Sequence, residues 1–382
     1  MQNSLKSRRR FDLPGVLFLL SLAMQPGLAC AADNKAGQFQ AILDSAVEAG
    51  LVGVSAYASR DDGFWAGVAG ETSADSAEPL GPESVFRIAS ITKLFTATVI
   101  LQLVDENALR LTDTLADRLS DNPASNIPHA DSITIAMLLN HSSGIYSFSD
   151  SNNFWREAYG NGGLDRIWEP AELIGYALQG EPYFTPGVEE RAQYSNSNYI
   201  LLGMIIEEVT GESLAVAFRH RIYEPLEMDH TLLEGFDAGQ DDIQHSFMKT
   251  GLLNRIVAVR RGWNSSENGL YDVSGNYRLY NSWAWAAGGI ASSSGDLHRF
   301  LLAVRDGSLL SASSQEILFR DNSAEGNAGL VFGGNGGWEG ISSSAYEINH
   351  EIYIVILTNT TGFDTDTDRL RSQFYRLLQA EN

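Results

Sequence analysis

The sequence predicts an α+β protein in which an antiparallel β-sheet is flanked by helices and carries an inserted all-helical subdomain. Strand-like runs occur near both ends of the chain, helical apolar spacing fills the middle, and an Asp-Gly turn joins the first two strand-like runs. A sheet that buries one face must be covered by a second layer, and helices are the elements available here.

The N-terminal part of the sheet is predicted as a helix followed by a hairpin. Residues 38–49 have helical apolar spacing, and residues 52–58 and 64–69 are strand-like. Asp61-Asp62-Gly63 separates the two runs, and an Asp-Gly turn in that position indicates a β-hairpin. Residues 90–106 then form a long predicted helix, because apolar side chains recur along one face.

The remaining elements divide the chain into two parts. Helices are predicted at residues 134–139, 170–178, 197–209, 213–222 and 368–379, and strands at residues 330–333, 342–348 and 352–358. We therefore assign residues 33–110 and 240–382 to a sheet domain, and residues 111–239 to the inserted helical subdomain. A pocket is expected in the cleft between the two.

Residues 1–32 are predicted to be a signal peptide. Four basic residues precede the apolar run Leu13–Met24, and small residues follow at Ala29 to Ala32. The apolar run is shorter than the roughly 20 residues of a membrane-spanning helix. Cleavage is expected near Ala31 or Ala32, which leaves no integral membrane segment and places the mature protein in the periplasm or outside the cell.

Cys30 is the only cysteine, so the mature chain holds no internal disulfide and no cysteine-based metal site. Lipidation at Cys30 is the alternative, although the preceding Gly27-Leu28-Ala29 fits a lipoprotein signal poorly. The net charge of -22 repels nucleic acid and anionic lipid. We expect a small-molecule or short-peptide substrate and no metal or organic cofactor.

Ser90 and Lys93 are the first candidate reactive pair. In Ser90-Ile91-Thr92-Lys93 the hydroxyl and the amine lie on neighbouring positions of one helix face. Lys93 accepts the serine proton if burial keeps the amine neutral, and the helix N-terminus favours the oxyanion formed on attack. A second copy, Ser246-Phe247-Met248-Lys249, has no clear helix behind it, so Ser90 is preferred.

Two further motifs offer polar groups that a nucleophilic serine needs. Tyr194 and Asn196 precede a long apolar run, where the phenol can relay a proton and the amide can bind Lys93 or a substrate carbonyl. A simple helix cap is the alternative. The glycine-rich stretch 333–338 suits a substrate that docks as an added strand, and a bulged or flexible strand is the alternative.

Together these motifs resemble the serine β-lactamase and penicillin-binding protein family. The similar branch contains class C β-lactamases, D-alanyl-D-alanine carboxypeptidases, D-aminopeptidases and related esterases. The resemblance covers residues 52–378 and includes the further stretches 86–114, 137–144, 186–187, 225–228, 287–290 and 294–297. It implies the β-lactamase/transpeptidase-like fold.

The resemblance also implies roles for the site residues. Ser90 would be the nucleophile, Lys93 its partner and Tyr194 the general acid or base. Asn196, Asn335 and Gly337 would bind substrate, and the N–H groups of Ser90 and Trp338 would form the oxyanion hole. His141 resembles a structural residue of the family.

Asn335 departs from the family pattern, which has lysine or histidine at this point of the third motif. Loss of a charge-assisted hydrogen bond to a substrate carboxylate removes about 1 to 2 kcal/mol, so efficient β-lactamase activity is in doubt. Lys249-Thr250-Gly251 spells the usual motif, but it falls too early in the chain, ahead of the Ala287-Gly288-Gly289 segment. Asn335 is therefore preferred.

The predicted function is an exported serine hydrolase that forms an acyl-enzyme on Ser90. Substrates would be D-amino-acid peptides, as for a D-Ala-D-Ala carboxypeptidase acting on a peptidoglycan stem peptide, or β-lactams or small esters. One alternative is an esterase with little β-lactam activity. Another is a non-catalytic cell-wall-binding protein, although such a protein has no need for Ser90, Lys93 and Tyr194 together.

Overall fold

We analysed a computed structural model of the chain. It describes residues 26–61, 63–74, 78–120, 123–160, 166–188, 191–249, 263–265, 269–274, 280–321, 331–362 and 367–380. The first 25 residues of the predicted signal peptide lie outside these ranges, and its predicted cleavage point falls within the helix that begins at Pro26. Among the described residues, no helix is long and apolar enough to cross a bilayer.

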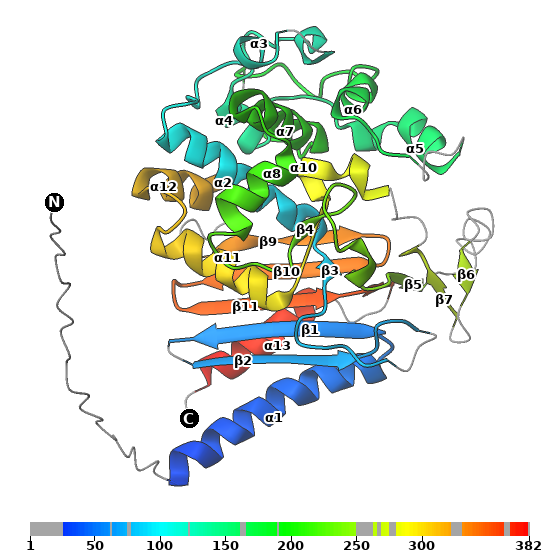
Figure 1. Cartoon of the computed structure of the whole chain (residues 1–382), viewed down its shortest axis with the longest axis vertical. Coiled ribbons are helices and arrows are strands. Elements are labelled where there is room, and N and C mark those ends of the chain that lie inside the picture. Colours follow the sequence, from blue (N-terminus) through cyan, green and yellow to red (C-terminus); the bar gives the residue numbers. More distant parts are fainter. Residues whose placement is uncertain are drawn as a thin grey trace, which may run out of the picture.

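The central layer is a five-stranded antiparallel sheet with the order β2-β1-β11-β10-β9 (Figure 1). Its strands are β1 (Gly53–Arg60), β2 (Gly63–Gly70), β9 (Val331–Trp338), β10 (Ile341–Ile348) and β11 (Ile352–Thr358). Strands from both ends of the chain meet where β1 pairs with β11. Strand β9 is left at the edge of the sheet, beside the helical layer.

Two terminal helices cover one face of this sheet. Helix α1 (Pro26–Glu48) and helix α13 (Thr367–Gln379) pack on β1 and β11 through a buried apolar cluster. The cluster includes Phe39, Leu43, Val54, Ala56, Ile354, Ile356, Leu370 and Phe374. Alternate residues of β1 point into this cluster, as expected for a strand in which side chains alternate between faces.

The opposite face of the sheet carries α11 (Ser294–Asp306) and, beyond it, the helical layer (Figure 1). The short helix η1 (Ala89–Ile91), which contains Ser90, leads into α2 (Thr92–Asp105). Helix α2 packs against α7 (Asn196–Thr210) and α10 (Trp285–Gly288). The other described helices are α3 (Leu115–Arg118), η2 (Pro123–Asn126), α4 (Ile135–Leu139), η3 (Phe148–Asp150), α5 (Asn152–Tyr159), α6 (Pro170–Ala177), α8 (Leu214–Phe218), η5 (Arg219–Tyr223), η6 (Gln240–Asp242), η8 (Tyr280–Trp283) and α12 (Ala312–Asp321).

Two small sheets complete the described elements. One has the order β3 (Phe86–Arg87), β8 (Ile290–Ser292) and β4 (Leu232–Leu233). The other has the order β12 (Thr360–Thr361), β5 (Phe247–Lys249), β7 (Leu270–Asp272) and β6 (Asn264–Ser265). Strand β4 lies within the predicted helical insert and pairs with β8, so the last part of that insert is not helical.

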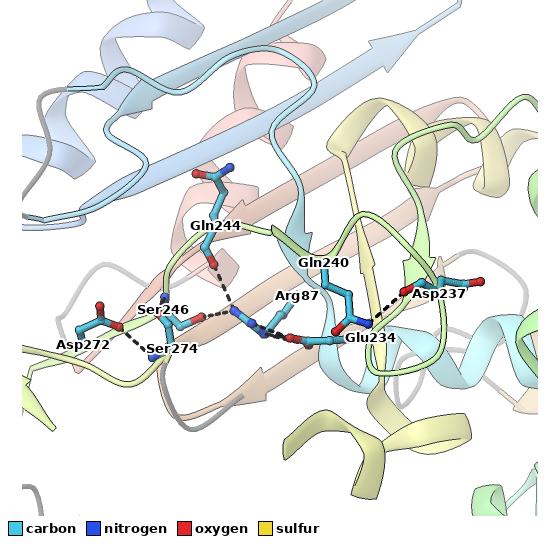
Figure 2. A network of polar contacts seen from close by, with 8 residues as sticks. All are labelled: Arg87, Glu234, Asp237, Gln240, Gln244, Ser246, Asp272 and Ser274. Atoms are coloured by element: carbon cyan, nitrogen blue, oxygen red, sulfur yellow. Dashed lines mark hydrogen bonds and ion pairs between the residues drawn. The ribbon is translucent and has the colours of Figure 1, made fainter. Parts of the chain in front are cut away.

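A buried ion pair anchors the strand that leads to Ser90 (Figure 2). The Arg87 guanidinium donates to both carboxylate oxygens of Glu234, at 2.6 and 2.9 Å, and both side chains are almost fully buried. Arg87 also donates to Ser246 Oγ at 3.2 Å and to the carbonyl oxygen of Gln244 at 3.1 Å. These bonds tie β3 to the chain that follows β4.

The glycine-rich stretch is a regular strand, longer than the predicted residues 330–333. Gly333 has φ of 140°, and a Cβ at this residue would lie 2.1 Å from the carbonyl oxygen of Ala345 on β10. Only glycine permits that backbone conformation and that close approach. The pairing with β10 runs one to one from Val331 to Trp338, so the bulged-strand alternative is wrong for these residues.

Candidate functional site

Ser90 lies on the turn between β3 and α2, and this turn packs against β9. The residue before it, Ala89, has φ of 45°, a left-handed conformation that is uncommon for a residue with a side chain and often occurs at functional sites. One residue earlier, the carbonyl oxygen of Ile88 accepts a 2.8 Å hydrogen bond from Ser343 Oγ on β10. The turn is thus fixed to the sheet immediately before Ser90.

Lys93 follows one helical turn later, and its amine makes three hydrogen bonds. Nζ donates to the carbonyl oxygen of Ala287 at 2.6 Å, to Asn196 Oδ1 at 2.9 Å and to Ser90 Oγ at 3.3 Å. Its side chain is buried, and burial lowers the pKa of Lys93, while the nearby Tyr194 opposes this shift. A buried amine that loses its proton readily is suited to accept one from Ser90.

Tyr194 reaches Ser90 from the other side. Its hydroxyl lies 2.8 Å from Ser90 Oγ, and its ring centroid lies 4.8 Å from Lys93 Nζ. The side chain of Tyr194 is 47% exposed, so the phenol faces the open cleft. Ser90 Oγ therefore lies between a buried amine and an exposed phenol.

Asn196 is the first residue of α7, and its side chain does not cap that helix. The amide oxygen accepts from Lys93, while Nδ2 donates to Ser149 Oγ at 2.9 Å. The Asn196 backbone N–H donates to Ser147 Oγ at 3.1 Å. Contacts on both ends of the amide fix which atom faces Lys93.

His141 supports the loop that carries Tyr194. Its Nδ1 accepts from the backbone N–H of Ser195 at 3.2 Å, and its ring packs on Tyr194 with centroids 4.6 Å apart. Burial, together with the positive charge of Lys93, lowers the pKa of His141 to about 3. A histidine that stays neutral and accepts a backbone hydrogen bond positions the loop, in agreement with the structural role expected from the sequence.

The pairing of β9 with β10 decides which backbone groups face the cleft. Trp338 pairs with Ile341 across the two-residue turn Glu339-Gly340, so this closing pair exchanges both of its hydrogen bonds. Hydrogen-bonded and non-hydrogen-bonded pairs alternate along an antiparallel ladder, so Gly337 directs its N–H to the open edge. The register thus favours Gly337 over Trp338 as the oxyanion donor from β9, and the sequence assignment is revised accordingly.

Gly336 brings β9 close to the nucleophile turn. A Cβ at Gly336 would lie 2.0 Å from the carbonyl oxygen of Ile88, which belongs to the turn that presents Ser90. The neighbouring Gly334 has open space where its Cβ would be. The absence of a side chain at Gly336 therefore lets the edge strand approach Ser90.

Asn335 faces the C-terminal helix. Its Nδ2 donates to Asp368 Oδ1 at 3.0 Å, and its Oδ1 accepts from Arg371 Nη1 at 3.1 Å. Asp368 and Arg371 are themselves paired at 2.9 Å. The charges near Asn335 therefore belong to an ion pair and cancel. Asn335, which the sequence analysis expected to bind substrate, is not among the residues that line the cleft at Ser90.

The rival motifs lie elsewhere. Ser246 is buried, and its hydroxyl accepts from Arg87 beside the Arg87–Glu234 ion pair (Figure 2). Lys249 is exposed at the end of β5, and side chains three residues apart along a strand point to opposite faces. The rest of the Lys249-Thr250-Gly251 motif lies outside the described residues.

A cleft of about 160 Å³ opens at Ser90. It is lined by Ala89, Ser90, Tyr194, Asn196, Trp283, Ala284, Ala287, Gly288, Gly337, Trp338 and Ile341. The sequence predicted a role for the backbone N–H of Trp338 only, and neither its side chain nor that of Trp283 was assigned to the site, since a lone tryptophan carries no pattern. Among the described residues, no group of three or more His, Cys, Asp or Glu side chains is placed to hold a metal ion.

The family model "Beta-lactamase" matches residues 36–375. Penicillin-binding protein 4* of Bacillus subtilis is 26% identical over 300 residues, which cover 74% of this chain and 62% of that protein. Penicillin-binding protein 4 of Amycolatopsis lactamdurans is 30% identical over 151 residues, 39% of this chain and 36% of the relative. The chain thus spans less than two thirds of the length of these relatives.

Solved structures match over a larger share of their length. A D-stereospecific amidohydrolase from Streptomyces has a TM-score of 0.71 at 29% identity, over 89% of this chain and 98% of the other. D-amino acid amidase from Ochrobactrum anthropi, complexed with L-phenylalanine amide, has a TM-score of 0.75 at 22% identity. The match covers 91% of this chain and 99% of the amidase. The latter likeness concerns the fold, which is the predicted antiparallel sheet with helices.

Proposed function

The chain belongs to the Beta-lactamase family and is a serine hydrolase of the β-lactamase and penicillin-binding type, and we propose that Ser90 is its nucleophile. One observation carries this assignment: Ser90 Oγ lies 3.3 Å from Lys93 Nζ and 2.8 Å from the Tyr194 hydroxyl. A serine hydroxyl is a weak nucleophile unless an adjacent base takes its proton, and this pair supplies both a base and an acid.

In the proposed acylation, neutral Lys93 takes the Ser90 proton as Oγ attacks the substrate carbonyl carbon. The bond to the leaving nitrogen or oxygen then breaks, and Tyr194 gives its proton to that atom. The proton on Lys93 then passes directly to the Tyr194 phenolate, since the two side chains interact with each other. Water repeats the sequence on the acyl-enzyme, which releases the acid and restores Ser90.

The proposed oxyanion hole consists of the N–H groups of Ser90 and Gly337. Ser90 lies at the start of the helical segment that continues into α2, where backbone N–H groups lack helical partners. Gly337 offers the edge-facing N–H of β9 and lines the same cleft. Losing one such donor costs roughly a hundredfold to a thousandfold in turnover in other acyl-transfer enzymes.

For substrates, we propose D-amino-acid peptides and amides or small esters, with slow reaction of β-lactams. Similarity to the D-stereospecific amidohydrolase supports the first class. Asn335 is neutral, the ion pair of Asp368 and Arg371 beside it has no net charge, and none of the three lines the cleft, so they support weak rather than strong binding of a substrate carboxylate. A carboxypeptidase acting on a peptidoglycan stem peptide is the more demanding form of the proposal, because it requires that carboxylate to bind.

We also propose that the chain is exported, with residues 1–32 removed. The support is the basic N-terminus followed by a short apolar run and small residues. N-terminal sequencing of protein recovered from the periplasm or medium tests this, and a start before Ala29 would contradict it.

The test of the catalytic proposal is the intact mass of the purified protein after mixing with an activated ester, a D-amino acid amide or a penicillin. Ser90→Ala should lose at least about a thousandfold in turnover and form no adduct. Ser246→Ala is the matched control, since it removes the serine of the rival motif, and should still acylate. Turnover retained in Ser90→Ala refutes the proposal, and binding of cell-wall peptide without acylation by any reagent favours the non-catalytic alternative.

A further inference from the structure

We propose that the cleft at Ser90 selects substrates whose acyl part carries an aromatic or similarly bulky apolar group, and that Trp338 and Trp283 form the walls that bind it. This rests on the proposed function, since the group is placed relative to an acyl carbon on Ser90. The tryptophans come from two segments, β9 and η8, that enclose the same cleft.

The tryptophans are held in a fixed arrangement. Trp338 stacks on Trp155 of α5 with centroids 5.1 Å apart and an interplanar angle of 15°. Trp283 meets Trp338 at 5.5 Å and 65°, and it meets Trp155 at 5.3 Å and 80°. Each ring is therefore supported by two others, and a preformed aromatic wall loses little side-chain freedom when a ligand binds.

Exposure shows which surface is available. Trp338 is 37% exposed although it is one of the largest apolar side chains, whereas Trp283 is buried but still lines the cleft. A partly exposed tryptophan beside a nucleophile offers apolar area that a ligand can cover. Trp155 lies behind Trp338 and is not among the cleft-lining residues.

Size and charge define the class of ligand. The cleft holds about 160 Å³, and a cavity of about 150 Å³ with apolar walls accommodates a benzene molecule. Apart from the polar site residues Ser90, Tyr194 and Asn196, its lining side chains are alanine, glycine, isoleucine and tryptophan. An uncharged space of this size fits one phenyl-sized group, and offers no counter-ion for a charged one.

The position of Trp338 indicates that it contacts the acyl part of the substrate and not the leaving group. Trp338 directly follows Gly337, whose N–H is the proposed oxyanion donor, so it lies next to the carbonyl that Ser90 attacks. Tyr194 is the proposed acid and marks the place where the leaving group receives its proton. A group bound by Trp338 is therefore retained in the acyl-enzyme.

Two 4-nitrophenyl esters with the same leaving group, acetate and phenylacetate, test this proposal. Burying a phenyl group should raise kcat/KM for phenylacetate over acetate by roughly tenfold to a hundredfold in the unaltered protein. Trp338→Ala should bring the ratio of the two kcat/KM values to within about threefold of one, whereas Trp338→Phe should keep most of the preference. Phe64→Ala removes a 72% exposed aromatic side chain on β2 and is the matched control, with an unchanged ratio.

The outcomes separate this proposal from the one on which it rests. Ser90-dependent hydrolysis with no aromatic preference, or a preference that Trp338→Ala retains, overturns the aromatic pocket alone. A preference of the same size for benzyl acetate over ethyl acetate, whose leaving alcohols have similar acidity, overturns the assignment to the acyl part. If Ser90→Ala hydrolyses both esters as fast as the unaltered protein, the nucleophile and the pocket fail together.

Discussion

Replacing Asn196 by aspartate places a carboxylate where the amide oxygen now lies 2.9 Å from Lys93 Nζ. The two side chains have the same shape, and the Ser149 hydroxyl, which now accepts from Asn196 Nδ2 at 2.9 Å, can turn to donate to the new oxygen. The substitution therefore changes the charge beside Lys93 with little change in packing. It tests whether Lys93 acts as a base that must be neutral.

The direction follows from charge. Burial lowers the pKa of Lys93, and a carboxylate at hydrogen-bond distance favours the protonated amine and opposes that effect. Unit charges about 4 Å apart interact by about 4 kcal/mol at an effective dielectric constant of about 20. Desolvation of the new carboxylate offsets part of this attraction. We therefore expect the neutral fraction of Lys93 near neutral pH to fall at least tenfold, which corresponds to a rise of ~1.4 kcal/mol in the free energy of deprotonation.

The pH profile of kcat/KM for an activated ester measures this effect. Because Lys93 must lose its proton to act, activity rises with pH, and its midpoint in the unaltered protein should lie below the 10.5 of an ordinary lysine. In Asn196→Asp the rising limb should move to higher pH, with activity recovering at alkaline pH. Asn196→Ala removes the contact without adding a charge, so its activity should stay reduced at every pH. A limb in Asn196→Asp that stays in place or moves to lower pH would refute the role of Lys93 as the base.

Three further predictions test other parts of the site. Gly336→Ala places a Cβ 2.0 Å from a backbone oxygen of the nucleophile turn and should lower kcat/KM roughly a hundredfold, whereas Gly334→Ala, with open space at its Cβ, should leave it nearly unchanged. Asp368→Asn leaves the neighbouring guanidinium of α13 without its counter-charge and should speed acylation by penicillin several-fold relative to a neutral ester, measured by intact mass. Glu234→Gln leaves the buried Arg87 guanidinium without its counter-charge and should lower the unfolding free energy by about 3 to 5 kcal/mol in chemical denaturation. Glu83→Gln, in an exposed pair, should change it by less than about 1 kcal/mol.

The fold class and the family were both predicted from the sequence and are confirmed. The helices and strands with clear periodicity lie close to where the pattern placed them, as at β11 and α13. The pattern was less successful where no side chains alternate. In residues 333–337 the glycines gave no strand periodicity, because their role is the close approach of two backbones, which depends on the partner strand.

The reactive serine and lysine could be predicted because their spacing is local. Three residues along a helix bring Ser90 and Lys93 together whatever the tertiary structure. Tyr194 and Asn196 were candidates from their place before an apolar run, but only the family resemblance linked them to Ser90. The choice between Gly337 and Trp338 as the oxyanion donor depends on the parity of the ladder with β10, which the sequence does not contain. Lys93 also donates to the backbone carbonyl oxygen of Ala287, and this contact could not be predicted from the sequence because it involves no side chain of Ala287.

The charge around Asn335 depends on residues that are distant in the sequence and contact it only in the folded protein. The resemblance to the family implies a cation at this point of the third motif, and the neutral Asn335 found there led to the expectation of weak carboxylate binding. In the structure a cation is nevertheless present, because Arg371, 36 residues further on, contacts the same amide, and Asp368, 33 residues further on, cancels it. In the proposed function, weak carboxylate binding therefore depends on Asp368 as much as on Asn335, and we expect Asp368→Asn to strengthen that binding without any change at Asn335.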